Sequence, residues 1–158
     1  MDQEFIEDVQ DLLCSDAVQR LKLYVHHKSG TRFDHSLYVA YRSYRFAKKM
    51  GWDSRAAARG GLLHDLFFYD WRDDDSPEGW HVTEHPVQAL REAEARFDLT
   101  DKEKDIIVKH MWPLSPWMPR YKESFTVSMM DKYCAMMECL FLGQRKLRRL
   151  AGAAGHVK

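Results

Sequence analysis

The chain has 158 residues, of which 45% are hydrophobic, 30% charged and 13% aromatic. The length predicts one domain over residues 1–158 with one core, and the composition excludes disordered, collagen-like and low-complexity classes. The 24 lysines and arginines balance the 24 aspartates and glutamates, so no net positive charge favours a stable complex with nucleic acid or binding to an anionic membrane.

The cysteines and the N-terminus predict a cytoplasmic location. Three cysteines, with no C-x-x-C pair among them, do not suggest a disulfide framework. Residues 1–13 are acidic where a secretory signal would begin with positive charge. No stretch approaches the roughly 18 apolar residues of a transmembrane helix. The sequence leaves the oligomeric state open.

Apolar residues recur with helical spacing through the first half of the chain. At least one weak helix is expected before residue 26, and an amphipathic helix is expected from Asp34 to a stop at Gly51. Asp53 is expected to cap the next helix, which contains Gly60 and Gly61. Each glycine costs about 1 kcal/mol relative to alanine, so this pair predicts close helix packing.

Helical spacing continues in the second half. Pro86 suits the first position of a helix, and Thr100 with Glu103 forms a capping box for a helix that runs through His110. A last helix is expected over residues 124–141, with an apolar stripe broad enough to be central to the core. These elements predict an all-α fold, a single bundle of six or seven helices.

Three segments lack this pattern. Residues 67–80 and 111–121 each contain proline and two tryptophans, and such loops act as lids or cover the core from outside; both interpretations stay open. Residues 144–158 are basic and then rich in glycine and alanine, which is typical of a fraying, solvated helix end.

Six side chains on successive helices form a candidate metal site: His35, His64, Asp65, His85, His110 and Asp131. Taken singly, each histidine is more often hydrogen-bonded than metal-bound, and Asp131 could pair with a lysine or arginine. Taken together, their order lets a bundle bring four imidazoles and two carboxylates to one centre. These ligands suit divalent ions of Fe, Mn, Co, Ni or Zn.

The order and local sequence resemble the HD-domain superfamily of metal-dependent phosphohydrolases, whose motif is an early His, a central His-Asp doublet and a late Asp. The similarity covers about residues 30–141. It includes RFDHSLYVA around His35, GGLLHDL around His64, EHPVQAL around His85 and SMMDKYCAMME around Asp131. The resemblance implies an all-α HD-type fold and one ion held by the four motif residues, His35, His64, Asp65 and Asp131.

In the bimetallic branch of that superfamily, two more histidines lie between the doublet and the last Asp. By that resemblance Asp65 would bridge to a second ion held by His85 and His110, whereas the mononuclear alternative keeps only the four motif residues. Two such ions can bind a phosphoryl oxygen and lower the pKa of a bridging water. The water beside Asp65 would be the nucleophile, which makes Asp65 the candidate catalytic residue.

One departure from the family bears on the substrate. Members that cleave cyclic dinucleotides commonly carry a lysine three positions after the motif Asp, where this chain has Phe68. Tyr69, Asp70 and Arg72 follow the ligands and are candidates for binding substrate, for protonating the leaving group or for fixing the loop. Lys132, beside the last motif residue, is expected to point into solvent.

The sequence therefore favours hydrolysis of a phosphomonoester or phosphodiester of a nucleotide or other small metabolite. The expected partner is a small phosphorylated substrate, without a stable nucleic-acid complex or membrane. Two alternatives use the same residues. One is a di-iron centre that activates O₂, as in the inositol oxygenases that resemble this family. The other is a nucleotide-sensing module without catalysis.

Overall fold

The computed structural model describes residues 2–25, 30–69 and 81–139. This part of the chain forms seven α-helices and one short 3-10 helix, without a β-strand, which confirms the predicted all-α fold. The elements are α1 (Gln3–Leu13), α2 (Asp16–Arg20), the 3-10 helix η1 (Leu21–Leu23), α3 (Arg32–Lys49), α4 (Ser54–Leu63), α5 (His81–Glu94), α6 (Asp101–Lys109) and α7 (Lys122–Cys139). None of these helices has the length and apolar character needed to cross a membrane.

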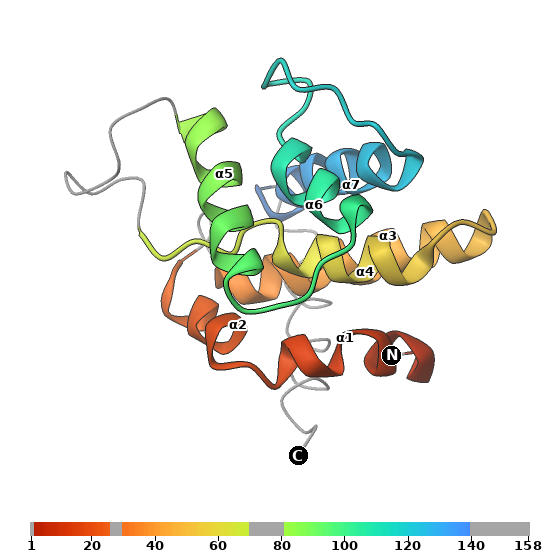
Figure 1. Ribbon diagram of the computed structural model, residues 1–158, viewed down its shortest axis with the longest axis horizontal. Coiled ribbons are helices and arrows are strands. Elements are labelled where there is room, and N and C mark those ends of the chain that lie inside the picture. The colour runs from red at the N-terminus through yellow and green to blue at the C-terminus, as the bar shows by residue number, and fades with distance from the viewer. Residues whose placement is uncertain (1, 26–29, 70–80, 140–158) are drawn as a thin grey trace.

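Helices α3 and α4 form the central pair of the bundle (Figure 1). Helices α6 and α7 lie on one side of this pair, α1 and α2 lie on the other, and α5 packs against α6 and α4. The predicted tail, residues 144–158, lies outside the described residues.

Local capping sets the ends of the central pair. Thr31 and Asp34 form a capping box, so α3 begins at Arg32 rather than at Asp34, and Gly51 with φ 66° follows its end. The Asp53 carboxylate accepts a hydrogen bond from the Ala56 N–H at 2.9 Å, as the sequence predicts for the cap of α4. Side chains that satisfy the first N–H groups of a helix fix where it begins.

The glycine pair in α4 confirms the predicted close packing. A Cβ at Gly60 would lie 2.6 Å from Cγ2 of Ile106 on α6, and a Cβ at Gly61 would lie 2.9 Å from Cα of Ala40 on α3. Both distances are shorter than real Cβ contacts. Without side chains at these two positions, α4 can contact α3 on one side and α6 on the other.

Helix α5 begins earlier than predicted. It starts at His81, and Pro86 lies inside the helix instead of at its first position. Proline has no N–H, so it cannot donate to the carbonyl of Val82, but its φ angle is compatible with a helix. The lost hydrogen bond falls near the N-terminal end of α5, where the helix tolerates it.

The buried face of α7 also differs from the predicted one. Phe125 and Met136, from the predicted apolar stripe, are 47% and 53% exposed, so the prediction that this stripe lies at the centre of the core is wrong. Apolar residues occur on all sides of α7, and their spacing does not single out one face. The buried positions are instead mostly small or polar: Glu123, Ser124, Thr126, Val127, Ser128, Cys134 and Glu138. Small side chains let α7 approach α3 and α6 closely.

Candidate metal centre

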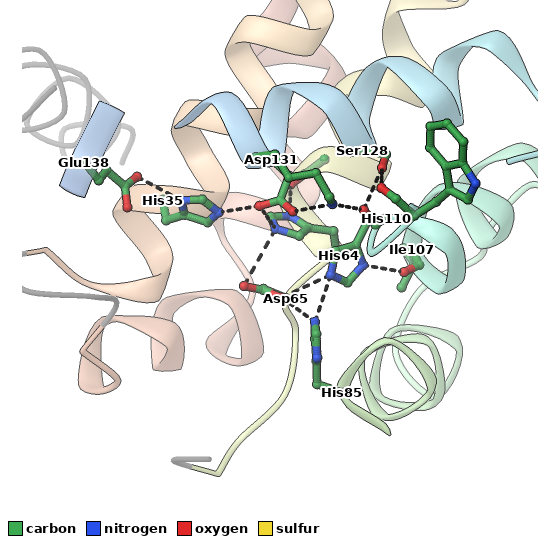
Figure 2. A network of polar contacts seen from close by, with 12 residues as sticks. His35, His64, Asp65, His85, Ile107, His110, Ser128, Asp131 and Glu138 are labelled. Carbon is green, nitrogen blue, oxygen red and sulfur yellow. Dashed lines mark hydrogen bonds and ion pairs between the residues drawn. The ribbon is translucent and has the colours of Figure 1, made fainter. Parts of the chain in front are cut away.

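The structure brings together all six side chains of the candidate site (Figure 2). They come from the first turn of α3, the end of α4, the middle of α5, the end of α6 and the middle of α7. In chain order they are His35, His64, Asp65, His85, His110 and Asp131. Five of them are buried, and Asp131 is partly buried.

One half of the centre is built around the carboxylate of Asp131. Its Oδ1 lies 3.0 Å from Nε2 of His35 and 3.6 Å from Nε2 of His64. The two imidazole rings are 5.5 Å apart between centroids. The three donor atoms fall within 4.8 Å of one another, a spacing that could hold one metal ion.

The other half is built around Asp65. Its Oδ2 lies 3.7 Å from Nε2 of His64, and its Oδ1 lies 3.5 Å from Nε2 of His85 and 3.6 Å from Nε2 of His110. The latter two nitrogens are 2.9 Å apart. A second group of donors that could hold a metal ion consists of His64, Asp65 and His110. Asp65 therefore lies between the two halves.

Backbone carbonyls orient two of the imidazoles. Nδ1 of His64 lies 2.8 Å from the carbonyl oxygen of Gly61, and Nδ1 of His110 lies 2.8 Å from that of Ile107. A carbonyl oxygen only accepts, so each Nδ1 donates and each Nε2 is the atom that faces the centre. The buried Nε2 of His64 has no hydrogen-bond partner in the described part of the chain. A cation between the imidazoles and the carboxylates would satisfy it, so the residues present fit a metal ion.

In the Asp131 half, the contact between His35 and Asp131 shifts the pKa values of both side chains. Burial disfavours a charged imidazole, but hydrogen bonds to Asp131 and Glu138 outweigh burial and raise the pKa of His35 to about 10. Burial also disfavours the Asp131 carboxylate, yet contacts with His35 and His64 hold the pKa of Asp131 well below its usual range. Without a metal ion, the Asp131 carboxylate therefore stays ionised, because a proton on the His35 imidazole compensates its negative charge.

The histidines near Asp65 behave in opposite ways. Burial, together with the neighbouring rings of His64 and His85, holds the pKa of His110 well below its usual value, so this imidazole stays neutral. The pKa of His64 is raised, because the charges of Asp65 and Asp131 outweigh burial. A neutral imidazole beside a carboxylate is the form that binds a metal ion.

A family model for the HD domain matches residues 32–136. The chain belongs to the HD-domain family. The matched segment runs from the first residue of α3 into the last part of α7 and includes all six site residues. HD-domain proteins are commonly metal-dependent hydrolases that bind divalent metals. Comparisons with curated proteins and with solved structures each gave no significant match.

Two residues that were not predicted to belong to the site also contact the centre. Glu138 Oε1 lies 2.8 Å from Nδ1 of His35. Lys132 Nζ donates to the His110 carbonyl at 2.5 Å and lies 3.3 Å from Asp131 Oδ2, so the expectation that Lys132 points into solvent is wrong. Glu138 follows Asp131 by two helical turns and therefore lies on the same face of α7, which is the signal that could have found it.

Of the three residues predicted to bind substrate, Tyr69 is described, whereas Asp70 and Arg72 lie outside the described residues. The Tyr69 ring is half-buried and lies 4.8 Å from the ring of Phe67, which in turn lies 5.3 Å from the His85 ring. Tyr69 is thus next to the centre, and its role in substrate binding stays a prediction.

The segments around the centre agree in part with the predicted loops. Residues 111–121 contain turns and bends rather than helix, as predicted. Most of the loop over residues 67–80 lies outside the described residues. Phe68 packs against the core, with its ring 4.7 Å from the Arg20 guanidinium and 6.3 Å from the Tyr24 ring. Phe68 therefore has an apolar packing role.

Proposed function

We propose that this protein is a metal-dependent phosphohydrolase that uses a metal-activated water to cleave a phosphomonoester or phosphodiester of a nucleotide or other small metabolite. The observation that carries the proposal is the convergence of four imidazoles and two carboxylates, with a buried, unpartnered Nε2 on His64. Membership of the HD-domain family supports the same reaction class.

The proposed ligands follow the two halves of the centre. One ion would be held by His35, His64, Asp65 and Asp131, and a second by His85 and His110 with Asp65 shared. When bound, one or two divalent ions of Fe, Mn, Co, Ni or Zn supply Lewis acidity and lower the pKa of a water to near neutrality. Asp65 is the proposed catalytic residue, because its carboxylate lies between both halves and can orient the attacking water.

The chain's own residues prepare this reaction. The carbonyls of Gly61 and Ile107 fix the rings of His64 and His110 before a ligand arrives, so little reorganisation is needed. Lys132 is 27% exposed at the rim of the centre, and its ammonium has three donors, of which two contact the His110 carbonyl and Asp131. The remaining donor could bind a phosphate oxygen of the substrate.

The test combines metal analysis with an activity panel. Protein purified without added metal is analysed for bound elements and then assayed on phosphomonoesters and phosphodiesters with Mn²⁺ or Fe²⁺. We expect bound transition metal and phosphate release. Oxygen uptake by the reduced iron form without phosphate release would indicate the di-iron oxygenase alternative. Bound metal with neither reaction would indicate a nucleotide-sensing module.

A variant at the shared ligand tests the site itself. We expect Asp65→Ala to lose bound metal and activity together, because Asp65 contacts both halves of the centre. The matched control is Asp105→Ala, which removes a buried aspartate of α6 whose partners are Lys109 and the backbone N–H of Arg120. Full metal content in the Asp65 variant would count heavily against the proposed centre.

A further inference from the structure

His35 differs from the other oriented histidines of the centre in what lies behind its ring. His64 and His110 each direct Nδ1 at a carbonyl of their own helix. Nδ1 of His35 instead contacts Oε1 of Glu138, a carboxylate from a different helix, at 2.8 Å (Figure 2). Glu138 is 6% exposed, so this contact is shielded from water.

A carboxylate acceptor acts more strongly on an imidazole than a carbonyl does. Hydrogen bonds to an ionised acceptor are roughly twice as strong as neutral ones, and burial reduces their screening. Glu138 therefore holds Nδ1 of His35 as the donor and directs Nε2 at Asp131 Oδ1, 3.0 Å away. A carboxylate behind a ligating histidine also makes its free nitrogen more basic.

This contact makes the two halves of the centre unequal. The half with His35 and His64 has Asp131 at its centre and Glu138 behind it, so two carboxylates favour a cation there. In the other half, Asp65 is the one described carboxylate that contacts His85 and His110. The Lys132 ammonium lies near both halves, 2.5 Å from the His110 carbonyl and 3.3 Å from Asp131 Oδ2, so it does not distinguish them. Coulomb attraction thus favours the first half for a divalent ion.

We propose that Glu138 is a positioning residue that acts through His35 and makes the half containing His35, His64 and Asp131 the tightest cation position of the centre. The inference rests on the proposed metal centre and does not depend on hydrolysis. It concerns ion affinity, so it is measured without a turnover assay.

The experiment is a calorimetric titration of the metal-free protein with Mn²⁺. We expect Glu138→Gln to weaken the tightest Mn²⁺ equivalent by about 10- to 100-fold, and Glu138→Ala to weaken it at least as much. The matched control is Glu123→Gln. Glu123 is also a buried glutamate of α7, but it accepts from the Asp53 N–H and from Lys102 at the other end of the helix. We expect the control to lower the melting temperature without changing Mn²⁺ affinity.

The outcomes separate this inference from the proposed function. Unchanged affinity in both Glu138 variants, or an equal loss in the Glu123 control, would overturn the role of Glu138. Failure of the unmodified protein to bind Mn²⁺ would overturn the metal centre and this inference together. Mn²⁺ binding with the expected loss in Glu138→Gln, but without phosphoester turnover, would support the inference and overturn the hydrolase. If Glu138→Gln does not fold, Glu138→Asp keeps the charge with a shorter reach, and the same weakening is expected in a smaller degree.

Discussion

The substitution Gly61→Ala should destabilise the fold and disturb the metal centre at once. Gly61 lies where α4 crosses α3, and an added Cβ would lie 2.9 Å from Cα and 3.3 Å from N of Ala40. These are backbone atoms, so no side-chain rotation can relieve the contact. The two helices would have to separate by roughly 0.5–1 Å to restore an ordinary carbon–carbon distance.

Two opposing effects set the expected change in the free energy of unfolding of Gly61→Ala. Alanine is favoured over glycine in a helix by about 1 kcal/mol. Overpacking of a well-packed core costs about 1–3 kcal/mol. Because the contacted atoms at Ala40 belong to the backbone and cannot rotate away, we expect a cost near the upper end of this range. We therefore expect Gly61→Ala to lower the free energy of unfolding by about 1–2 kcal/mol. Because α3 holds His35 and α4 holds His64, we also expect weaker Mn²⁺ binding.

Urea denaturation of both proteins, followed by circular dichroism, measures the change in stability. Adding Ala40→Gly provides a control for the geometry, because it removes only a Cβ that lies 3.6 Å from the new methyl and leaves the Ala40 backbone in place. The double variant should therefore not recover stability. A Gly61→Ala protein that is more stable than the unmodified one, with unchanged Mn²⁺ affinity, would refute the packing argument.

Two further predictions concern buried charges. Arg59 donates to the buried Glu103 at 2.9 Å and to Asp11 at 2.6 Å. Arg59→Met leaves the buried Glu103 carboxylate without its cation, so we expect the free energy of unfolding measured by urea denaturation to fall by about 3 kcal/mol. A loss below about 1 kcal/mol would contradict this expectation. Although burial disfavours its charge, His35 has its pKa raised to about 10 by hydrogen bonds to Asp131 and Glu138, so it is protonated near neutral pH in the metal-free protein. A cation must displace that proton, so affinity should rise about tenfold per pH unit below pH 10. Titrations in two buffers of different ionisation enthalpy would report the released proton, and a pH-independent affinity would count against it.

The features that the sequence predicted well are those fixed by neighbours along the chain. The Asp53 cap and the capping box of Thr100 with Glu103 are both present, because each needs only residues three positions apart. The close packing of α4 could also be predicted from its two glycines. A helix interior that accepts Gly60 and Gly61 at a cost needs a compensating close contact, and both contacts are observed.

The features that the sequence missed depend on contacts between helices. The spacing of Glu138 from Asp131 places Glu138 on the same face of α7, but it does not reveal that Glu138 contacts His35 on α3. Nothing near Lys132 in the chain indicates that Lys132 contacts the end of α6. The buried face of α7 was missed because it carries small and polar residues, with Phe125 turned outward. The spacing of apolar residues identifies the buried face of a helix only when that face packs against other apolar side chains. The buried face of α7 packs beside a polar centre, so apolar spacing does not reveal it.

The arrangement of the centre has a common physical origin in helix ends. His64 and His110 are the C-caps of α4 and α6, where the last carbonyls lack partners within the helix. Each ring satisfies one of these carbonyls with its own Nδ1–H, so the helix that carries the histidine also orients it. The two C-termini bring partial negative charge to the same place, which favours a cation. His35 lies at the beginning of α3, where no such carbonyl is available, and so its ring needs a partner from elsewhere. Glu138 supplies that partner from α7, so the orientation of His35 depends on a tertiary contact, whereas His64 and His110 are oriented by carbonyls of their own helices.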